Sequence, residues 1–130
     1  MTIQQFITKH NVGAKISRVP FRLDQQDGEW DAQAKHYAFT ISYDGKSLRG
    51  HYSQGSGIKS LPKCVDVLNA VLLDASGIDG TSFDMWCGDY GYDTDSRKAH
   101  ETYLACLKEC DDLRRVFGTS FDELMECETL

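Results

Sequence analysis

Residues 82–118, SFDMWCGDYGYDTDSRKAHETYLACLKECDDLRRVFG, decide how this chain folds. After Ser96 the apolar residues recur at steps of three and four, which is the period of one helix face. They are Ala99, Tyr103, Cys106, Leu107, Cys110, Leu113 and Phe117. Thr94, Asp95 or Ser96 can cap the start of this helix, and Gly118 suits its end. The stretch therefore predicts one long amphipathic helix that needs an apolar surface to pack against.

A second long helix is predicted over residues 61–75, because Ser60 is a suitable N-cap and Pro62 a suitable first-turn residue. Its apolar stripe is broad, which indicates burial on two sides and a central place in the core. Gly77 and Gly80 are expected to end it. A short opening helix is predicted from Ile3, Phe6 and Ile7, with Asn11 and Gly13 closing it, and another over residues 81–88, capped at Thr81 or Ser82. A last short helix is predicted after Ser120, where Glu123 completes a capping-box pattern.

The strand signals lie between the first short helix and the central one. Residues 35–43 and 47–53 alternate in polarity and flank Asp44 and Gly45, a dipeptide typical of tight hairpins. Residues 14–23 form a third candidate strand, in which Pro20 favours a sheet edge or a bulge. The sequence thus predicts one α+β domain over residues 1–130, with an antiparallel sheet of about three strands packed against two main helices and several short ones.

The composition restricts the class of protein. With 130 residues and 41% hydrophobic side chains the chain can bury one ordinary core. It has no apolar run of membrane-spanning length, and its start lacks the features of a secretory signal, so a cytoplasmic protein without membrane contact is expected.

Five cysteines, an odd number without a CxxC pair, disfavour a disulfide scaffold. Cys106 and Cys110 at helical spacing, with Cys87 or His100, form a conceivable zinc site. Packing of thiols on helix faces is the commoner reason for such pairs, so no metal and no cofactor is predicted.

Charge is distributed unevenly along the chain, whose net charge is −6. Residues 1–63 hold nine Lys or Arg and five acids, whereas residues 64–96 hold seven Asp and no Lys, Arg or Glu. A concentrated acidic zone disfavours direct nucleic-acid binding there and favours a basic partner surface. The alternative is that these Asp residues are helix caps and turn formers that happen to cluster.

No catalytic residues are predicted, because the four histidines are scattered and no nucleophile motif is present. The loop from Asp89 fails the pattern of a calcium site, since Thr94 and His100 occupy the positions that require Gly and Glu. Gly55 and Gly57 precede a helix start, as in phosphate-binding loops, but no such motif is complete. An anion at that helix start stays open as an alternative.

The C-terminal half carries a recognisable set of short motifs. They are PxxxDVL from Pro62, DAS from Asp74, SFDxWC from Ser82, GYDTDSRKA from Gly91, YxxC from Tyr103 and LxxxxG from Leu113. This set resembles a family of small, largely uncharacterised proteins of tailed bacteriophages and prophages. The resemblance implies a small accessory protein expressed in a bacterial host, a setting in which small acidic proteins often inhibit host defence.

The leading hypothesis is therefore a stoichiometric inhibitor, most concretely an anti-CRISPR protein that blocks the nucleic-acid channel of an effector complex. The predicted partner-binding residues are Asp79, Asp84, Asp89, Tyr90, Tyr92, Asp93 and Asp95. Arg97 is assigned a structural role, in which it pairs with Tyr92 and locks the loop to the helix. The oligomeric state is left open.

The alternative hypothesis is an accessory protein that binds single-stranded nucleic acid or DNA-metabolism proteins through a basic sheet. Its predicted cations are Lys15, Arg18, Arg22 and Arg49, with Tyr37, Phe39 or Tyr52 as stacking platforms. A small-molecule site near residues 53–60 is a third hypothesis.

Overall fold

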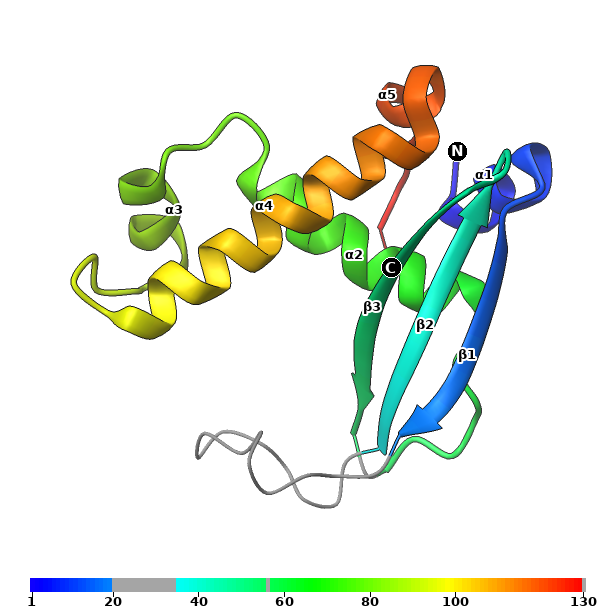
Figure 1. Ribbon diagram of the computed structural model, residues 1–130, viewed down its shortest axis with the longest axis horizontal. Coiled ribbons are helices and arrows are strands. Elements are labelled where there is room, and N and C mark those ends of the chain that lie inside the picture. Colours follow the sequence, from blue (N-terminus) through cyan, green and yellow to red (C-terminus); the bar gives the residue numbers. More distant parts are fainter. Residues whose placement is uncertain (20–34, 56, 130) are drawn as a thin grey trace.

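The computed structural model describes residues 1–19, 35–55 and 57–129 (Figure 1). Its elements are, in order, α1 (Ile3–His10), β1 (Gly13–Val19), β2 (Lys35–Tyr43), β3 (Lys46–Gln54), α2 (Cys64–Ile78), α3 (Phe83–Tyr90), α4 (Arg97–Phe117), the 3-10 turn η2 (Gly118–Ser120) and α5 (Phe121–Met125). The strands form one antiparallel sheet in the order β1-β2-β3. The predicted α+β class and the three-stranded sheet are confirmed.

The hairpin between β2 and β3 turns at Asp44 and Gly45, whose φ values are +50° and +77°. Two successive positive φ values are what a two-residue hairpin turn requires, so this dipeptide fixes the register. Ile41 then pairs with Ala14 on one side and Leu48 on the other, all on the face toward the helices. The opposite face carries Lys15, Thr40 and Arg49 side by side.

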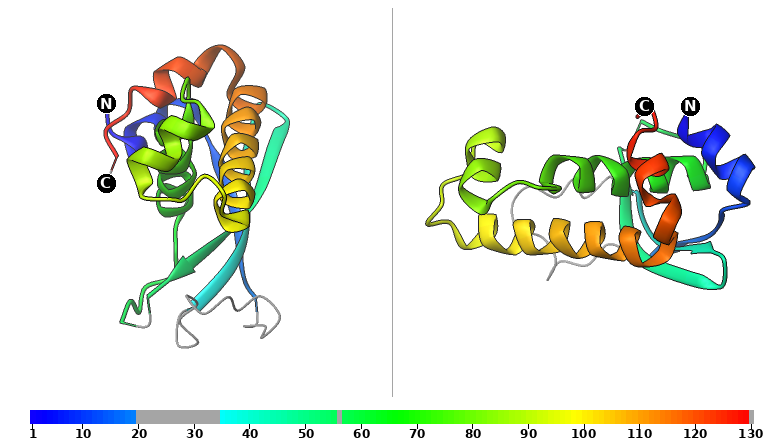
Figure 2. Two further views of the ribbon diagram at one scale, coloured as in Figure 1. Left: turned by 90° about the vertical axis from the view of Figure 1, so that its left-hand side faces the viewer. Right: turned by 90° about the horizontal axis from the view of Figure 1, so that it is seen from above.

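Helices α2 and α4 cross each other and cover one face of the sheet (Figures 1 and 2). The broad stripe of α2 is buried, as the sequence predicts, and comprises Val67, Leu68, Val71, Leu72, Ala75 and Ile78. From α4, Leu113, Val116 and Phe117 join the same core. The central place of α2 is thereby confirmed.

The molecule is elongated, with the sheet at one end and α3 at the other (Figures 1 and 2). Both α2 and α4 extend beyond the sheet, and α3 with its flanking loops joins their far ends. Helices α1 and α5 lie together beside the sheet, where Lys9 and His10 both bond to Glu123. Residues of the basic sheet and of the acidic loop region are therefore far apart.

The start of α2 differs from the prediction. The helix begins at Cys64 instead of Leu61, and Lys63 occupies the N-cap position in place of Ser60. Leu61 directly precedes Pro62, and a residue before proline disfavours the helical conformation. The carboxylate of Asp66 then reaches back and accepts the N–H of Lys63 at 2.7 Å.

Two further boundary predictions are wrong. Gly77 lies inside α2, which continues to Ile78, so it does not end the helix. Ser120 makes no side-chain cap to α5. Its hydroxyl instead bonds to the hydroxyl of Tyr43 at 3.1 Å, and Glu123 is engaged by α1. For Ser120 and Glu123, tertiary contacts engage side chains that the local pattern assigns to a helix cap.

Candidate functional site

The α3 helix is a short element with a strong start and two different faces. Ser82, one of the two predicted caps, accepts the N–H of Met85 at 3.3 Å. Trp86 and Cys87 are buried, and Phe83 packs against the core from the same side. Because eight residues give only about two turns, this apolar face is what holds α3 in place.

Three aromatic rings from α3 and the loop after it are in contact. Tyr92 stacks on Trp86 with ring centroids 4.9 Å apart and an interplanar angle of 7°. Tyr90 tilts against Trp86 at 5.6 Å, and its hydroxyl lies over Gly77, where a Cβ would be 1.9 Å away. Tyr92 therefore serves mainly to cover Trp86, while Tyr90 rests on α2 and keeps 54% of its surface exposed.

Two of the five predicted partner-binding carboxylates are engaged within the protein. Asp79 forms an ion pair with Arg114 of α4. Asp93 accepts the N–H of Asp95 at 3.0 Å, and its carbonyl accepts the N–H of Ser96. Asp79 thus links the end of α2 to α4, and Asp93 stabilises a turn. These two carboxylates have the structural roles that the alternative interpretation of the acidic cluster proposes.

The other three carboxylates lie on the surface. Asp84, Asp89 and Asp95 are exposed, and no ion pair or side-chain hydrogen bond engages them among the described residues. On α3 the exposed positions Asp84, Met85, Gly88 and Asp89 form one stripe, since residues four apart share a helix face. We call this stripe the outward face of α3.

Met85 is the residue that the sequence reasoning missed. Its side chain is 61% exposed between Asp84 and Asp89. The signal was available, because helical spacing from Trp86 and Cys87 places position 85 away from the buried side. An exposed methionine flanked by carboxylates is an adaptable apolar contact within an acidic surface.

The predicted pairing of Arg97 with Tyr92 is wrong. Arg97 bonds to Glu101 at 3.0 Å one turn further along α4, and its side chain is 93% exposed. A Tyr92 ring stacked on Trp86 is already held by a larger apolar contact, so it needs no cation to fix it.

A pocket of about 320 Å³ opens between α2, α3 and α4. Its lining is formed by Leu73, Asp74, Trp86, Tyr90, Tyr92, Thr102 and Cys106. Trp86 is only 4% exposed and forms the deepest part, whereas Leu73 and Tyr90 are exposed at the rim. Two of the predicted partner-binding residues, Tyr90 and Tyr92, thus share one concave site.

A carboxyl pair lies next to this pocket. The pKa of Glu109 is raised to about 8. Burial is the largest cause, and the adjacent carboxyl of Asp74 is the next. Burial, with Asp74 and Glu109 nearby, also raises the pKa of the Cys106 thiol to about 12. At neutral pH Glu109 is thus mostly protonated and Cys106 is a neutral thiol.

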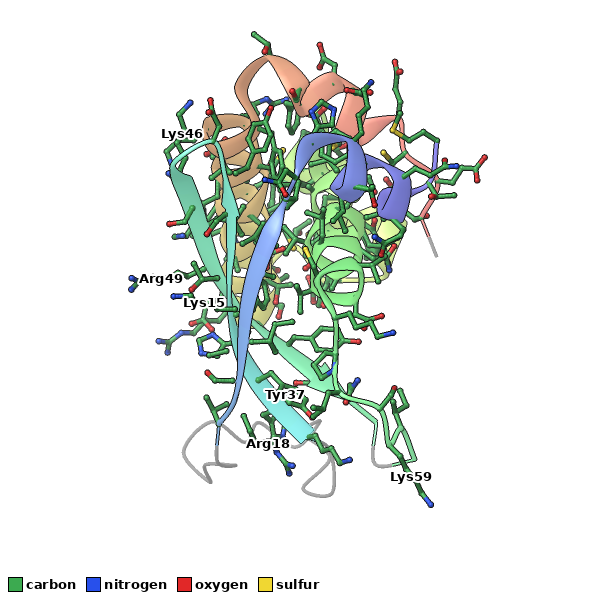
Figure 3. The ribbon with its side chains drawn as sticks, turned by 90° about the vertical axis from the view of Figure 1, so that its right-hand side faces the viewer. Lys15, Arg18, Tyr37, Lys46, Arg49 and Lys59 are labelled. Carbon is green, nitrogen blue, oxygen red and sulfur yellow. The ribbon has the colours of Figure 1, made fainter. Side chains whose placement is uncertain are left out.

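The outer sheet face is a second concave surface, of about 590 Å³. Lys15, Ser17, Thr40, Arg49 and His51 line it, and no acidic residue of the described chain does so. Figure 3 shows Lys15 and Arg49 pointing away from the helices, on the same side of the sheet. This surface offers several donors to an anion.

The predicted basic surface is only partly assembled. Arg18 lies on the helix side of the sheet, with its guanidinium carbon 6.0 Å from the ring centre of Tyr37. Tyr37 and Phe39 are buried and Tyr52 is half-buried, so none of them is a stacking platform on the outer face (Figure 3). Arg22 lies outside the described residues. Strand alternation therefore separates cations that the prediction grouped.

Comparison with models of protein families, with characterised proteins and with solved structures found no match. The phage resemblance thus stays a prediction. In the described part of the chain, no group of His, Cys, Asp and Glu is arranged to hold a metal ion. None of the helices there combines the length and apolarity that crossing a membrane requires.

Proposed function

We propose that this protein is a stoichiometric binder that docks the outward face of α3 on a basic protein surface. The observation that carries the proposal is the exposed stripe Asp84, Met85, Gly88 and Asp89 at one end of an elongated molecule. Carboxylates without partners steer toward a basic surface, and an exposed apolar side chain between them supplies a contact to bury.

The rigidity of the site supports the same proposal. Two contacts attach α3 and its flanking loops to α4. Trp86 stacks on Tyr92, and the Tyr103 hydroxyl donates a hydrogen bond to the Thr81 carbonyl at 3.1 Å. A helix held in this way loses little freedom when a partner binds its outer side, so less binding energy is spent on ordering it.

The phage resemblance gives the proposal its most concrete form. A basic channel that accepts nucleic acid is a surface to which a rigid array of carboxylates is complementary. The protein would then inhibit a host defence complex, an anti-CRISPR activity being the specific version, by occupying the place of phosphates. The affinity of such a complex falls with rising salt.

The experiment is capture of tagged protein from a lysate of its bacterial host, followed by mass spectrometry. The wild-type chain is compared with the triple variant Asp84→Asn, Met85→Ala and Asp89→Asn. The matched control is Lys15→Gln with Arg49→Gln, at the opposite end of the molecule. Heparin is added as a competitor, because a polyanion occupies a basic surface.

We expect the wild-type chain to capture a basic protein that heparin displaces. The α3 variant should no longer capture this protein, whereas the sheet control should still capture it. A partner retained by the α3 variant would refute the proposal. Circular dichroism of each variant checks that the helices are intact, so that lost capture is not confused with lost folding.

A second candidate function rests on the outer sheet face. Lys15 and Arg49 flank Thr40 in a concave surface without acidic lining, which suits a phosphate backbone. Since the aromatic residues of the sheet lie on the other side, recognition here would use phosphates instead of base stacking.

Fluorescence anisotropy with labelled single-stranded DNA tests this second candidate. If it holds, Lys15→Gln with Arg49→Gln abolishes binding, and the salt slope of the wild type is about −1.4 for two phosphate contacts. Lys46→Gln, at the hairpin turn, is the matched control. Binding that is equal in all three proteins would refute it.

A further inference from the structure

The pocket between α2, α3 and α4 joins three aromatic rings to a carboxylate. Trp86 and Tyr92 lie nearly parallel, whereas Tyr90 is inclined to Trp86 by 46°. Asp74 lies on the α2 side, and Thr102 adds a hydroxyl from α4. No lysine or arginine of the described chain lines the pocket.

We propose that this pocket receives an arginine side chain of the basic partner. The inference rests on the proposed function and deepens it, because it names the group that enters the site. Aromatic faces attract a cation through their negative quadrupole. A carboxylate at the side of the pocket complements the positive charge and accepts hydrogen bonds from it.

The shape of the pocket favours a guanidinium over an ammonium group. A guanidinium is planar and weakly hydrated, so it stacks on a ring and loses little hydration when it enters an apolar site. Its fork of N–H groups can bond Asp74 while the plane rests on an aromatic face. A volume of about 320 Å³ is small for a drug-sized ligand but sufficient for one side chain.

The walls of the pocket are preformed. Tyr90 is braced by Gly77, where even a Cβ has no room beside the ring. Tyr92 is fixed by its stacking on Trp86. An entering side chain therefore meets rings already in position, and binding needs no rearrangement of α3.

The test is a fluorescence titration that observes Trp86. Trp30 and Trp86 are the two tryptophans of the chain, so a Trp30→Phe protein reports Trp86 alone. The probe is N-acetyl-arginine amide, and the control is the citrulline analogue, which has the same shape without the charge, at matched salt. Amide chemical shifts of Asp74 and Thr102 in the unmodified protein give a second readout.

The expected result is a saturable change with the arginine probe and none with the citrulline analogue. Tyr90→Leu, which keeps an apolar side chain but removes the ring, should weaken binding about three- to tenfold, and Asp74→Asn should weaken it similarly. Lys46→Gln, at the hairpin turn and away from the pocket, should leave it unchanged. No saturable response, an equal response to citrulline, or indifference to Tyr90→Leu would overturn the inference.

The two proposals fail separately. If partner capture depends on Met85 and Asp89 while the arginine probe does not bind, the pocket inference is wrong and the docking proposal stands. If the probe binds while capture ignores the α3 variant, the docking face is wrong and the pocket remains an arginine site.

Discussion

At the scale of single residues, Glu109 combines partial burial with a carboxyl neighbour. Protonated Glu109 shares a hydrogen bond with the carboxyl of Asp74, whereas ionised Glu109 would add a negative charge beside it. The pKa of about 8 in the folded protein lies above the ordinary value of 4.5. The stability that Glu109 contributes is therefore present below pH 4.5 and is lost as the pH rises through 8.

Glu109→Gln should accordingly stabilise the protein at alkaline pH. The expected gain in the free energy of unfolding at pH 9 is about 1–2 kcal/mol, after discounting for partial exposure, with little gain at pH 4. Urea denaturation at the two pH values measures it, with the exposed Glu126→Gln as control. An equal effect at both pH values would show that the pKa is not raised.

Gly50 is the second residue on which a prediction rests. A Cβ placed there would lie 2.5 Å from the Phe39 ring, and that ring is buried. Gly50→Ala should therefore destabilise the fold by about 1–3 kcal/mol, because the ring has to shift within the core. Thermal unfolding measures this, and an unchanged or raised Tm would contradict the contact.

The residue scale also shows what the sequence could and could not predict. Alternation in residues 35–43 correctly predicts which side chains of β2 face the helices. It does not reveal that Gly50 makes room for Phe39 or that Gly77 lies against Tyr90, because these contacts join distant segments. Local periodicity specifies a face, but it does not specify the partner on that face.

At the scale of elements, the start of α2 shows which of two residues stabilises the N-terminus of the helix. The Lys63 N–H is accepted by Asp66, whereas Ser60 lies three residues before the N-cap. Asp66→Ala should cost about 1 kcal/mol of stability, and Ser60→Ala should cost much less. Denaturation of the two variants measures the difference, and a larger loss for Ser60→Ala would restore the cap that the sequence suggests.

Helix α3 shows how the candidate site was partly predictable. The cap at Ser82, the apolar side with Trp86 and the neighbouring acidic cluster are all readable from local sequence. The roles of individual carboxylates are not, because Asp79 meets Arg114 from a segment thirty-five residues away. Met85 was missed, although its spacing from the buried residues was informative.

At the scale of the whole molecule, the outer sheet face and the outward face of α3 carry opposite charges and lie at opposite ends (Figure 2). The sheet face carries Lys15 and Arg49, and the α3 face carries Asp84 and Asp89. Such a separation orients the approach to a basic partner, with α3 leading. The sequence predicts the charge blocks, but only the fold places them at opposite ends.

The rate of association with a captured basic partner should therefore depend on salt. Between low ionic strength and about 1 M salt, where the Debye length is about 3 Å, the rate should fall at least about tenfold. Dissociation should change less, because the contacts of Met85 are apolar. Surface plasmon resonance measures both rates, and an association rate independent of salt would exclude electrostatic steering.

The most direct test of the docking face is site-specific photo-crosslinking in the bacterial host. A photoreactive amino acid replaces Met85 in one protein and His51, on the outer sheet face, in another. The account predicts a covalent adduct with one basic protein from position 85 and no such adduct from position 51. Adducts from position 51 alone, with protein or with nucleic acid, would contradict it.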